Sequence, residues 1–402
     1  MLLSWTAVVC LAAVCQGGRY KAPDPLEVRF PYNRIPTITE LINDAGYKHE
    51  PHLVTTEDGH ILALHRISQP AFTSEERGVP VLIISGFTYQ ADSFLALGNA
   101  SLPFTLVNLG YDVWLGEKRG NERSLGHVEY EMDDFRNFNY SIHEQGIYDL
   151  PSLIDYILEA TGRSQILYVG YSLSCGMVIV MNSERPEYND KLQGVVFLAP
   201  AGHLKKLEEN PFDYASGVAV LVSMIESQIQ NRQWLLFGKL EMIKSLYLSC
   251  SNGIINLMCR TFINAFYGLS TTTNPKYLGY QLALATTTEC IYTAKHLMQV
   301  IKHGRFCKYD YGKRKNMEVY GSSSPPNYNF NNTKAPVFLF YGTTDKMVTP
   351  DAAKRTGKEV GYLYDSATIK GFDHGDFLLS VSAPRNVYER IIDYFDTLTG
   401  KH

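Results

Sequence analysis

Short runs of mostly apolar residues recur along the chain, separated by polar or helix-length stretches. The clearest runs lie at 81–84, 111–115, 166–169, 195–198 and 336–341. Because their apolarity is continuous rather than alternating, they predict strands buried on both faces, as in a parallel sheet covered by helices. The stretches 148–161 and 177–183 between them predict helices, and a last helix is expected near 387–395. This alternation of strand and helix is typical of an α/β fold.

The alternation stops after Ala199-Pro200-Ala201. From about 202 to 306 the sequence has no strong strand pattern, but it has a helix-length apolar stretch at 215–225 and an apolar cluster at 234–237. An insertion of this length is too long for a loop, so we predict a helical subdomain. It follows the carboxyl end of a strand, where ligands of open α/β sheets bind, and we therefore expect a cap over the site. A helical insertion that only enlarges the core is the alternative.

The first residues, from Met1 to Val14, are mostly apolar, and small or polar residues follow at 15–18. This run is too short to cross a bilayer comfortably, so we predict that residues 1–18 are a cleaved signal peptide. A buried N-terminal strand is the alternative. Because no other run is long and apolar enough for a membrane helix, we expect no transmembrane segment in the mature chain.

Composition narrows the class of protein. The 402 residues are 45% hydrophobic and 19% charged, which suits a large core and differs from the composition of disordered chains. Lys and Arg number 37 against 41 Asp and Glu, for a net charge of −4 with no basic block. Nucleic acid is therefore not an expected partner. No cluster of metal-ligand residues is evident, so neither a metal nor a cofactor is predicted.

A secreted chain could form disulfides and carry glycans. Removal of the signal peptide leaves five cysteines, Cys175, Cys250, Cys259, Cys290 and Cys307. An odd number leaves at least one thiol free. A bond between Cys250 and Cys259 would close a short loop and contribute about 2–3 kcal/mol by the chain-entropy argument. Candidate N-glycosylation sequons begin at Asn99, Asn139 and Asn331.

One of the apolar runs ends in a pattern that is typical of a catalytic serine. The segment Leu167-Tyr168-Val169-Gly170-Tyr171-Ser172-Leu173-Ser174 predicts a strand that enters a sharp turn with a serine at its apex. This is the layout of a nucleophile elbow, in which a strained turn exposes a serine hydroxyl above an α/β-hydrolase sheet. The usual pattern is G-x-S-x-G, and Ser174 replaces the second glycine. Ser174 is also the rival nucleophile, but only Ser172 follows the strand and Gly170 at the elbow spacing.

A serine hydroxyl needs an adjacent base, which an acid orients, and α/β-hydrolases place them in the order Ser, Asp, His. Asp345 follows the run that ends near 341, and His374 precedes the last predicted helix. We therefore predict Ser172 as nucleophile, Asp345 as orienting acid and His374 as base. Taken singly, the three could be a helix N-cap, a turn residue and a histidine without a catalytic role.

An oxyanion hole would complete such a site. In this architecture its donors are backbone N–H groups from the residue after the nucleophile and from a loop after an early strand. Here these residues are Leu173 and Phe87, the latter in Ile84-Ser85-Gly86-Phe87-Thr88. Because the donors are main-chain groups, substitution of side chains does not remove them, although it can misplace them.

Together these residues resemble the acid lipase family, which comprises the gastric and lysosomal acid lipases and their insect relatives. Matching stretches lie at 54–62, 111–116, 119–121, 148–151, 167–170, 199–200, 320–321, 325–326 and 382–384. The first reads Val-Thr-Thr-Glu-Asp-Gly-His-Ile-Leu, with His60 where the family has tyrosine. The resemblance runs from about Glu27 to Phe395, which is nearly all of the mature chain.

The resemblance implies a secreted or lysosomal glycoprotein that hydrolyses esters of neutral lipids at a lipid–water interface, with a helical cap and lid. It carries the triad onto Ser172, Asp345 and His374, and it places Cys250 and Cys259 where the family has a cap disulfide. It gives no pairing for Cys290 and Cys307. The implied organisation is a signal peptide (1–18), a first core part (19–201), a cap and lid (202–310) and a second core part (311–402).

The chain departs from the family at the site. Ser85-Gly86-Phe87 replaces H-G-L, and the elbow is Gly170-Tyr171-Ser172-Leu173-Ser174 instead of G-H-S-x-G. The Cβ and hydroxyl of Ser174 could overpack the turn at a cost of roughly 1–3 kcal/mol unless its neighbours adjust. A lipid-binding or storage protein with weakened catalysis is therefore one alternative to a lipase, and an esterase for short soluble esters is another.

Overall fold

The computed structural model describes residues 35–401 except for 70–77, 133, 205–226, 228–234, 237–239, 251–252 and 269. The predicted signal peptide, the helix expected at 215–225 and two of the four residues of the cluster at 234–237 lie outside the described residues. Within the described part, none of the helices has the length and apolar character needed to cross a membrane.

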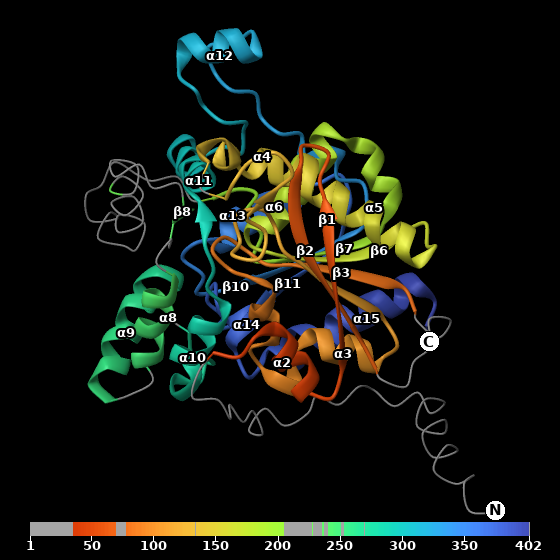
Figure 1. Cartoon of the computed structure of the whole chain (residues 1–402), viewed down its shortest axis with the longest axis vertical. Helices are drawn as coiled ribbons and strands as arrows, with labels where there is room; N and C mark the ends of the chain where they lie inside the picture. Colours follow the sequence, from red (N-terminus) through yellow and green to blue (C-terminus); the bar gives the residue numbers. More distant parts are fainter. Residues whose placement is uncertain are drawn as a thin grey trace, which may run out of the picture.

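A large sheet of nine strands forms the centre of the described structure (Figure 1). Its strands are β1 (Lys48–Thr55), β2 (His60–Ser68), β3 (Pro80–Ile84), β4 (Asp112–Gly116), β5 (Gly126–His127), β6 (Ile166–Tyr171), β7 (Leu192–Leu198), β10 (Val337–Gly342) and β11 (Leu363–Ile369). Their order is β1-β2-β4-β3-β6-β7-β10-β11, with β5 beside β2. The strands from β4 to β11 pair in parallel, whereas β2 is antiparallel to both β1 and β4. The five predicted strands are confirmed as β3, β4, β6, β7 and β10.

Successive residues of the parallel strands pack on opposite faces of the sheet. On β3, Ile83 belongs to one buried cluster and Ile84 to the other. On β7, Val196 and Phe197 divide in the same way. Because both faces are covered, both sets of side chains must be apolar, which explains the continuous apolar runs.

Helices cover each face of the sheet (Figure 1). One layer contains α2 (Ile38–Asp44), α3 (Leu102–Asn108), α14 (Asp376–Leu379) and α15 (Glu389–Thr399), and the other contains α5 (Leu150–Thr161), α6 (Leu173–Glu184) and α13 (Pro350–Glu359). Helix α4 (Ile142–Glu144) leads into α5 through a π-helical turn. The three predicted helices are therefore confirmed as α5, α6 and α15. The arrangement is that of the predicted α/β-hydrolase fold, a mostly parallel sheet flanked by helices.

Where the structure describes it, the chain between β7 and β10 is mostly helical and contains two short strands. Its elements are β8 (Leu235–Leu236), α8 (Leu240–Ser249), α9 (Gly253–Tyr267), α10 (Pro275–Ala285), β9 (Glu289–Cys290), α11 (Ile291–His303) and α12 (Lys313–Tyr320). The short strands β8 and β9, which the sequence did not predict, pair with each other. Backbone bridges join Tyr89 to Thr286 and Gly268 to Asp345. Helices α9 and α10 are therefore tied to the loops that follow β3 and β10.

Motifs far apart in the sequence meet in one buried ion network. Arg119 donates from Nε to Asp149 at 2.6 Å and from its two terminal nitrogens to Asp58 at 2.6 and 2.7 Å. The Arg119 side chain is 1% exposed and that of Asp149 is fully buried. Removal of one partner would leave an uncompensated buried charge, so this network fixes how the segments pack.

Candidate active site

Ser172 occupies the turn between β6 and α6. Its backbone has φ 57° and ψ −112°, a conformation that a residue with a side chain adopts only at a cost. The turn is held by hydrogen bonds from the Ser172 N–H to the Leu198 carbonyl at 2.8 Å and from the Ala201 N–H to the Ser172 carbonyl at 3.1 Å. The chain thus forms the strained strand-to-helix elbow that the sequence predicts.

Two glycines allow close approach to this turn. A Cβ on Gly86 would lie 3.0 Å from the Ser172 Cβ and from the Tyr171 ring. A Cβ on Gly170 would lie 2.8 Å from the Tyr168 ring and 3.1 Å from the Ser174 hydroxyl. Glycine is therefore needed at both positions for the strands and the turn to pack as they do.

His374 and Asp345 continue from Ser172 as a hydrogen-bonded chain. His374 Nε2 lies 2.9 Å from the Ser172 hydroxyl oxygen, and His374 Nδ1 lies 2.8 Å from Asp345 Oδ2. The three residues are 7%, 3% and 3% exposed for Ser172, His374 and Asp345 respectively. A carboxylate only accepts hydrogen bonds, so Nδ1 carries the proton and Nε2 is free to accept one from the serine.

Further contacts fix the acid and the histidine. Asp345 Oδ1 accepts the backbone N–H groups of Met347 and Val348, both at 2.8 Å. The His374 N–H donates to the Tyr267 carbonyl at the end of α9, and the His374 carbonyl accepts from the Tyr171 hydroxyl at 3.0 Å. The Tyr171 and His374 rings lie 5.2 Å apart. The backbone of His374 is thus held by groups from the elbow and from α9, and its imidazole by Asp345 in the loop after β10.

The residues predicted to supply the oxyanion hole flank the turn. Leu173 is the first residue of α6, so its N–H has no carbonyl partner within the helix. Phe87 follows Gly86 in a tight loop after β3, in which the Ser85 hydroxyl donates to the Tyr89 carbonyl at 2.7 Å. Because a Cβ on Gly86 would touch Ser172, the Phe87 loop lies directly beside the elbow.

Two acidic residues near His374, Asp373 and Asp376, belong to the site but were not predicted from the sequence. Asp373 Oδ1 accepts the N–H groups of Gly375 and Asp376, and Asp376 accepts hydrogen bonds from the hydroxyls of Ser270 and Thr273. Burial, followed by the charges of Asp376 and Asp345, raises the pKa of Asp373 to about 8. The sequence shows that both residues are close to His374. It gives no sign that they are buried, because acidic residues in turns are usually exposed.

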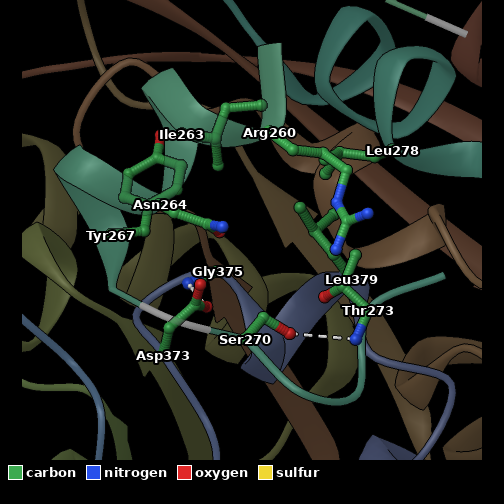
Figure 2. A pocket seen from close by; sticks show the side chains of 10 residues that line it. All are labelled: Arg260, Ile263, Asn264, Tyr267, Ser270, Thr273, Leu278, Asp373, Gly375 and Leu379. Atoms are coloured by element: carbon green, nitrogen blue, oxygen red, sulfur yellow. Dashed lines mark hydrogen bonds between the residues drawn. The ribbon is translucent and has the colours of Figure 1, made fainter. Parts of the chain in front are cut away.

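An open hollow separates α9 from the loop of His374. It is lined by Arg260, Ile263, Asn264, Tyr267, Ser270, Thr273, Leu278, Asp373, Gly375 and Leu379. Figure 2 shows Asn264 of α9 above Gly375 and Asp373, and Arg260 of the same helix reaching toward Leu379 and Thr273. One face of α9 therefore lines the same hollow as the segment that positions the histidine.

The structure also describes the predicted cysteine and glycan positions. Cys250 and Cys259 form a disulfide that joins the end of α8 to α9. Cys175, Cys290 and Cys307 are buried free thiols. The predicted sequon asparagines are all exposed, at Asn99, Asn139 and Asn331. Among the residues that the structure describes, no group of three or more His, Cys, Asp or Glu side chains is arranged to hold a metal ion.

Comparison with known proteins places this chain in a family. The family described as a partial alpha/beta-hydrolase lipase region matches residues 38–98, and the family described as the alpha/beta hydrolase fold matches residues 79–363. Lipase 1 of Drosophila melanogaster is 32% identical over 89% of this chain and 79% of its own length. Gastric triacylglycerol lipase of Mus musculus is 30% identical over 88% of this chain and 90% of its own length.

A solved structure supports the fold alone. The structure of lip1 from Acinetobacter baumannii AYE has a TM-score of 0.54 with 11% identity, and the match covers 93% of this chain and 100% of that one. The resemblance to gastric lipases and their insect relatives is therefore confirmed by sequence, and the α/β-hydrolase fold by structure. The chain belongs to the α/β-hydrolase lipase family and is a carboxylic ester hydrolase.

Proposed function

We propose that the protein hydrolyses esters of neutral lipids, of the triacylglycerol or cholesteryl ester type, through an acyl-enzyme on Ser172. The observation that carries this proposal is the hydrogen-bonded chain from Ser172 through His374 to Asp345. A strained serine with a base and an acid in line is the arrangement that acyl transfer requires.

In the first step, His374 Nε2 takes the Ser172 proton while the serine oxygen attacks the ester carbonyl carbon. The negative charge on the carbonyl oxygen is then held by the N–H groups of Leu173 and Phe87. His374 returns its proton to the departing alcohol oxygen as the ester C–O bond breaks, which leaves the acyl group on Ser172.

The second step reverses these roles. His374 takes a proton from water, the resulting hydroxide attacks the acyl carbon, and the fatty acid leaves as the serine regains its proton. Asp345 keeps the imidazole oriented and stabilises its positive charge in both steps. Every bond made or broken involves the ester, water, Ser172 or His374, so this reaction uses no cofactor.

A lipid substrate is favoured by the relatives and by the insertion between β7 and β10. The gastric relative is named a triacylglycerol lipase. We assign residues 202–310 to a cap and lid over the site, 19–201 and 311–402 to the core, and 1–18 to a signal peptide. The disulfide between Cys250 and Cys259 and the exposed sequons suit a secreted or lysosomal location.

A lipid carrier built on the lipase scaffold is the second candidate, because Ser85 and Ser174 replace family residues. The strained backbone of Ser172 argues against it. Strain of this kind costs of order 1–3 kcal/mol and is typical of functional sites. An esterase for short soluble esters shares the chemistry and differs in the shape of the cap.

The test compares hydrolysis of an emulsified long-chain triglyceride and of a short soluble ester by the wild type and Ser172→Ala. We expect wild-type activity on both, with a preference for the emulsion, and loss of both activities in a folded Ser172→Ala variant. A preference for the soluble ester would identify an esterase. A folded wild type that binds lipid but is inactive on both substrates from acid to neutral pH would identify a carrier.

A further inference from the structure

Ser174 occupies the position where the elbow pattern has its second glycine, and its side chain is fully buried. The hydroxyl accepts the backbone N–H of Tyr171 at 2.8 Å and donates to the carbonyl of Ile84, also at 2.8 Å. The Tyr171 carbonyl lies 3.0 Å from the same oxygen. With its hydrogen-bonding capacity used in this way, Ser174 is not available as a nucleophile.

The two backbone groups that Ser174 joins belong to different parts of the site. Tyr171 is the residue before Ser172, and Ile84 is the last residue of β3, just before the loop of Phe87. The parallel pairing of β3 with β6 ends at Ile84 and Gly170. Beyond this pair β3 ends, whereas β6 continues to Tyr171, which pairs with Leu198 of β7. The Ser174 hydroxyl bridges the two strands just past the end of their own pairing.

We propose that Ser174 is a positioning residue, whose hydroxyl sets the distance between the nucleophile turn and the oxyanion loop. This inference rests on the proposed function. The ester carbon bonds to Ser172 while its oxygen is held by Leu173 on the elbow and by Phe87 on the loop. A shift of the loop against the elbow therefore misplaces one donor but not the other, and errors near 1 Å can cost about 10²-fold in rate.

The packing around the bridge leaves little room for adjustment. A Cβ on Gly86 would lie 3.0 Å from the Ser172 Cβ, so the oxyanion loop touches the elbow at its glycine. Within the loop, the Ser85 hydroxyl holds the Tyr89 carbonyl at 2.7 Å. Ser85 thus fixes the shape of the loop, and Ser174 fixes its position relative to Ser172.

Replacement of Ser174 by the glycine of the family pattern should therefore slow catalysis. Ser174→Gly leaves the Tyr171 N–H and the Ile84 carbonyl without their shared partner, and Ser174→Ala does the same while it keeps the Cβ. For both variants we expect kcat per active site to fall about tenfold or more, with KM changed less than about twofold. Ser124→Ala is the matched control, because Ser124 is also buried and its hydroxyl accepts a backbone N–H, that of Ala63 at 3.0 Å.

The experiment measures kcat and KM on a short soluble ester, and the rate at which a p-nitrophenyl alkylphosphonate inactivates the enzyme by bonding to Ser172. The released nitrophenol counts active sites, and thermal unfolding reports stability. The expected result is slower turnover and slower inactivation per titrated site in both Ser174 variants, with Ser124→Ala like the wild type. A purely structural role lowers the melting temperature and the number of active sites but leaves kcat per site unchanged.

Wild-type kcat per titrated site in both Ser174 variants would overturn the inference, and so would an equal loss in Ser124→Ala. If Ser174→Gly does not fold, Ser174→Ala decides alone. Failure of the proposed function looks different, because the wild type itself would then neither hydrolyse the ester nor react with the phosphonate.

Discussion

His374 Nε2 lies 2.9 Å from the hydroxyl oxygen of Ser172, although 202 positions separate these residues in the sequence. Ser172 follows β6, whereas His374 follows β11, which lies three places along the sheet. Loops that leave the carboxyl ends of parallel strands meet at one edge of the sheet. The strand order therefore brings the proposed nucleophile and base to the same edge of the sheet. Hydrogen bonds from the Tyr171 hydroxyl and to the Tyr267 carbonyl then fix the backbone of His374 beside Ser172.

The contact of Asp345 with His374 gives the first prediction. Asp345→Asn keeps an oxygen for the N–H groups of Met347 and Val348, but it turns an N–H₂ group toward His374 Nδ1. The histidine then adopts the wrong tautomer, with the proton on Nε2. We expect kcat on a soluble ester to fall by about 10⁴-fold with the fold intact. Asp351→Asn, at an exposed carboxylate of α13, should have wild-type kcat, and a loss below tenfold in Asp345→Asn would exclude the proposed role.

Tyr171 gives a milder prediction. Its hydroxyl donates to the His374 carbonyl at 3.0 Å, and the family has histidine at this position. Tyr171→Phe removes this bond but keeps the ring beside the imidazole, so His374 loses one of its backbone anchors. We expect kcat to fall about three- to tenfold, with little change in KM.

The matched control for Tyr171→Phe is Tyr188→Phe, which removes another hydroxyl from a buried tyrosine, one bonded to Asp155 at 2.8 Å. Both variants lose a hydrogen bond and should lose similar stability. Equal kcat values in the two variants would show that the Tyr171 hydroxyl does not act on the site.

The five strands that the sequence predicted are buried on both faces. The runs of β3, β6, β7 and β10 are apolar throughout because helices cover both faces. Strand β11 was missed because it lies at the edge of the sheet and most of its residues, such as Asp365, are exposed. A strand with so little burial carries no continuous apolar pattern.

In the site, too, some features were predictable from the sequence and others were not. Ser172, Asp345 and His374 stand in a recognisable order after strands, so the sequence could predict their meeting. The bonds from Ser174 to Ile84 and from Tyr171 to His374 link segments 90 and 203 positions apart. Such contacts depend on side-chain placement in the folded protein. At Ser174, the sequence suggested overpacking, whereas the structure shows a hydroxyl with partners on both sides.

Gly86 supplies a steric prediction. A Cβ added here would lie 3.0 Å from the Ser172 Cβ and from the Tyr171 ring, so the oxyanion loop must move away from the elbow in Gly86→Ala. Because a displaced donor costs roughly 10²–10³-fold, we expect kcat to fall by at least about tenfold. Gly126→Ala is the control, since a Cβ there meets its nearest neighbour at 3.5 Å. Unchanged turnover in Gly86→Ala would show that the loop has room to spare.

The disulfide between Cys250 and Cys259 should stabilise α8 and α9 without acting on the chemistry. Its loop is short, with a sequence separation of 9, and the chain-entropy argument gives about 2–3 kcal/mol. In the double variant Cys250→Ser/Cys259→Ser we expect a lower melting temperature and faster proteolysis within 240–267. A reductant should bring the wild type to the same melting temperature and leave the variant unchanged. An equal effect of reductant on both would assign the change to another thiol.

Asp373 predicts how stability depends on pH. Burial and the charges of Asp376 and Asp345 raise its pKa to about 8 in the folded protein, whereas the unfolded chain releases this proton near the ordinary value of 3.8. Between these values the folded state holds one more proton, so the contribution of Asp373 to stability falls as pH rises from about 4 to 8. Asp373→Asn removes this dependence and retains an oxygen for the N–H groups of Gly375 and Asp376.

We therefore expect the stability of Asp373→Asn relative to the wild type to increase with pH across this window, by at most about 1.4 kcal/mol per pH unit. Urea unfolding of both proteins at several pH values between about 4.5 and 8 measures the difference in their free energies of unfolding. Asp365→Asn serves as the control, because this exposed carboxylate is solvated in both states. A constant difference between Asp373→Asn and the wild type would mean that Asp373 is already ionised at pH 4.5, and that the loop of His374 carries its full negative charge throughout.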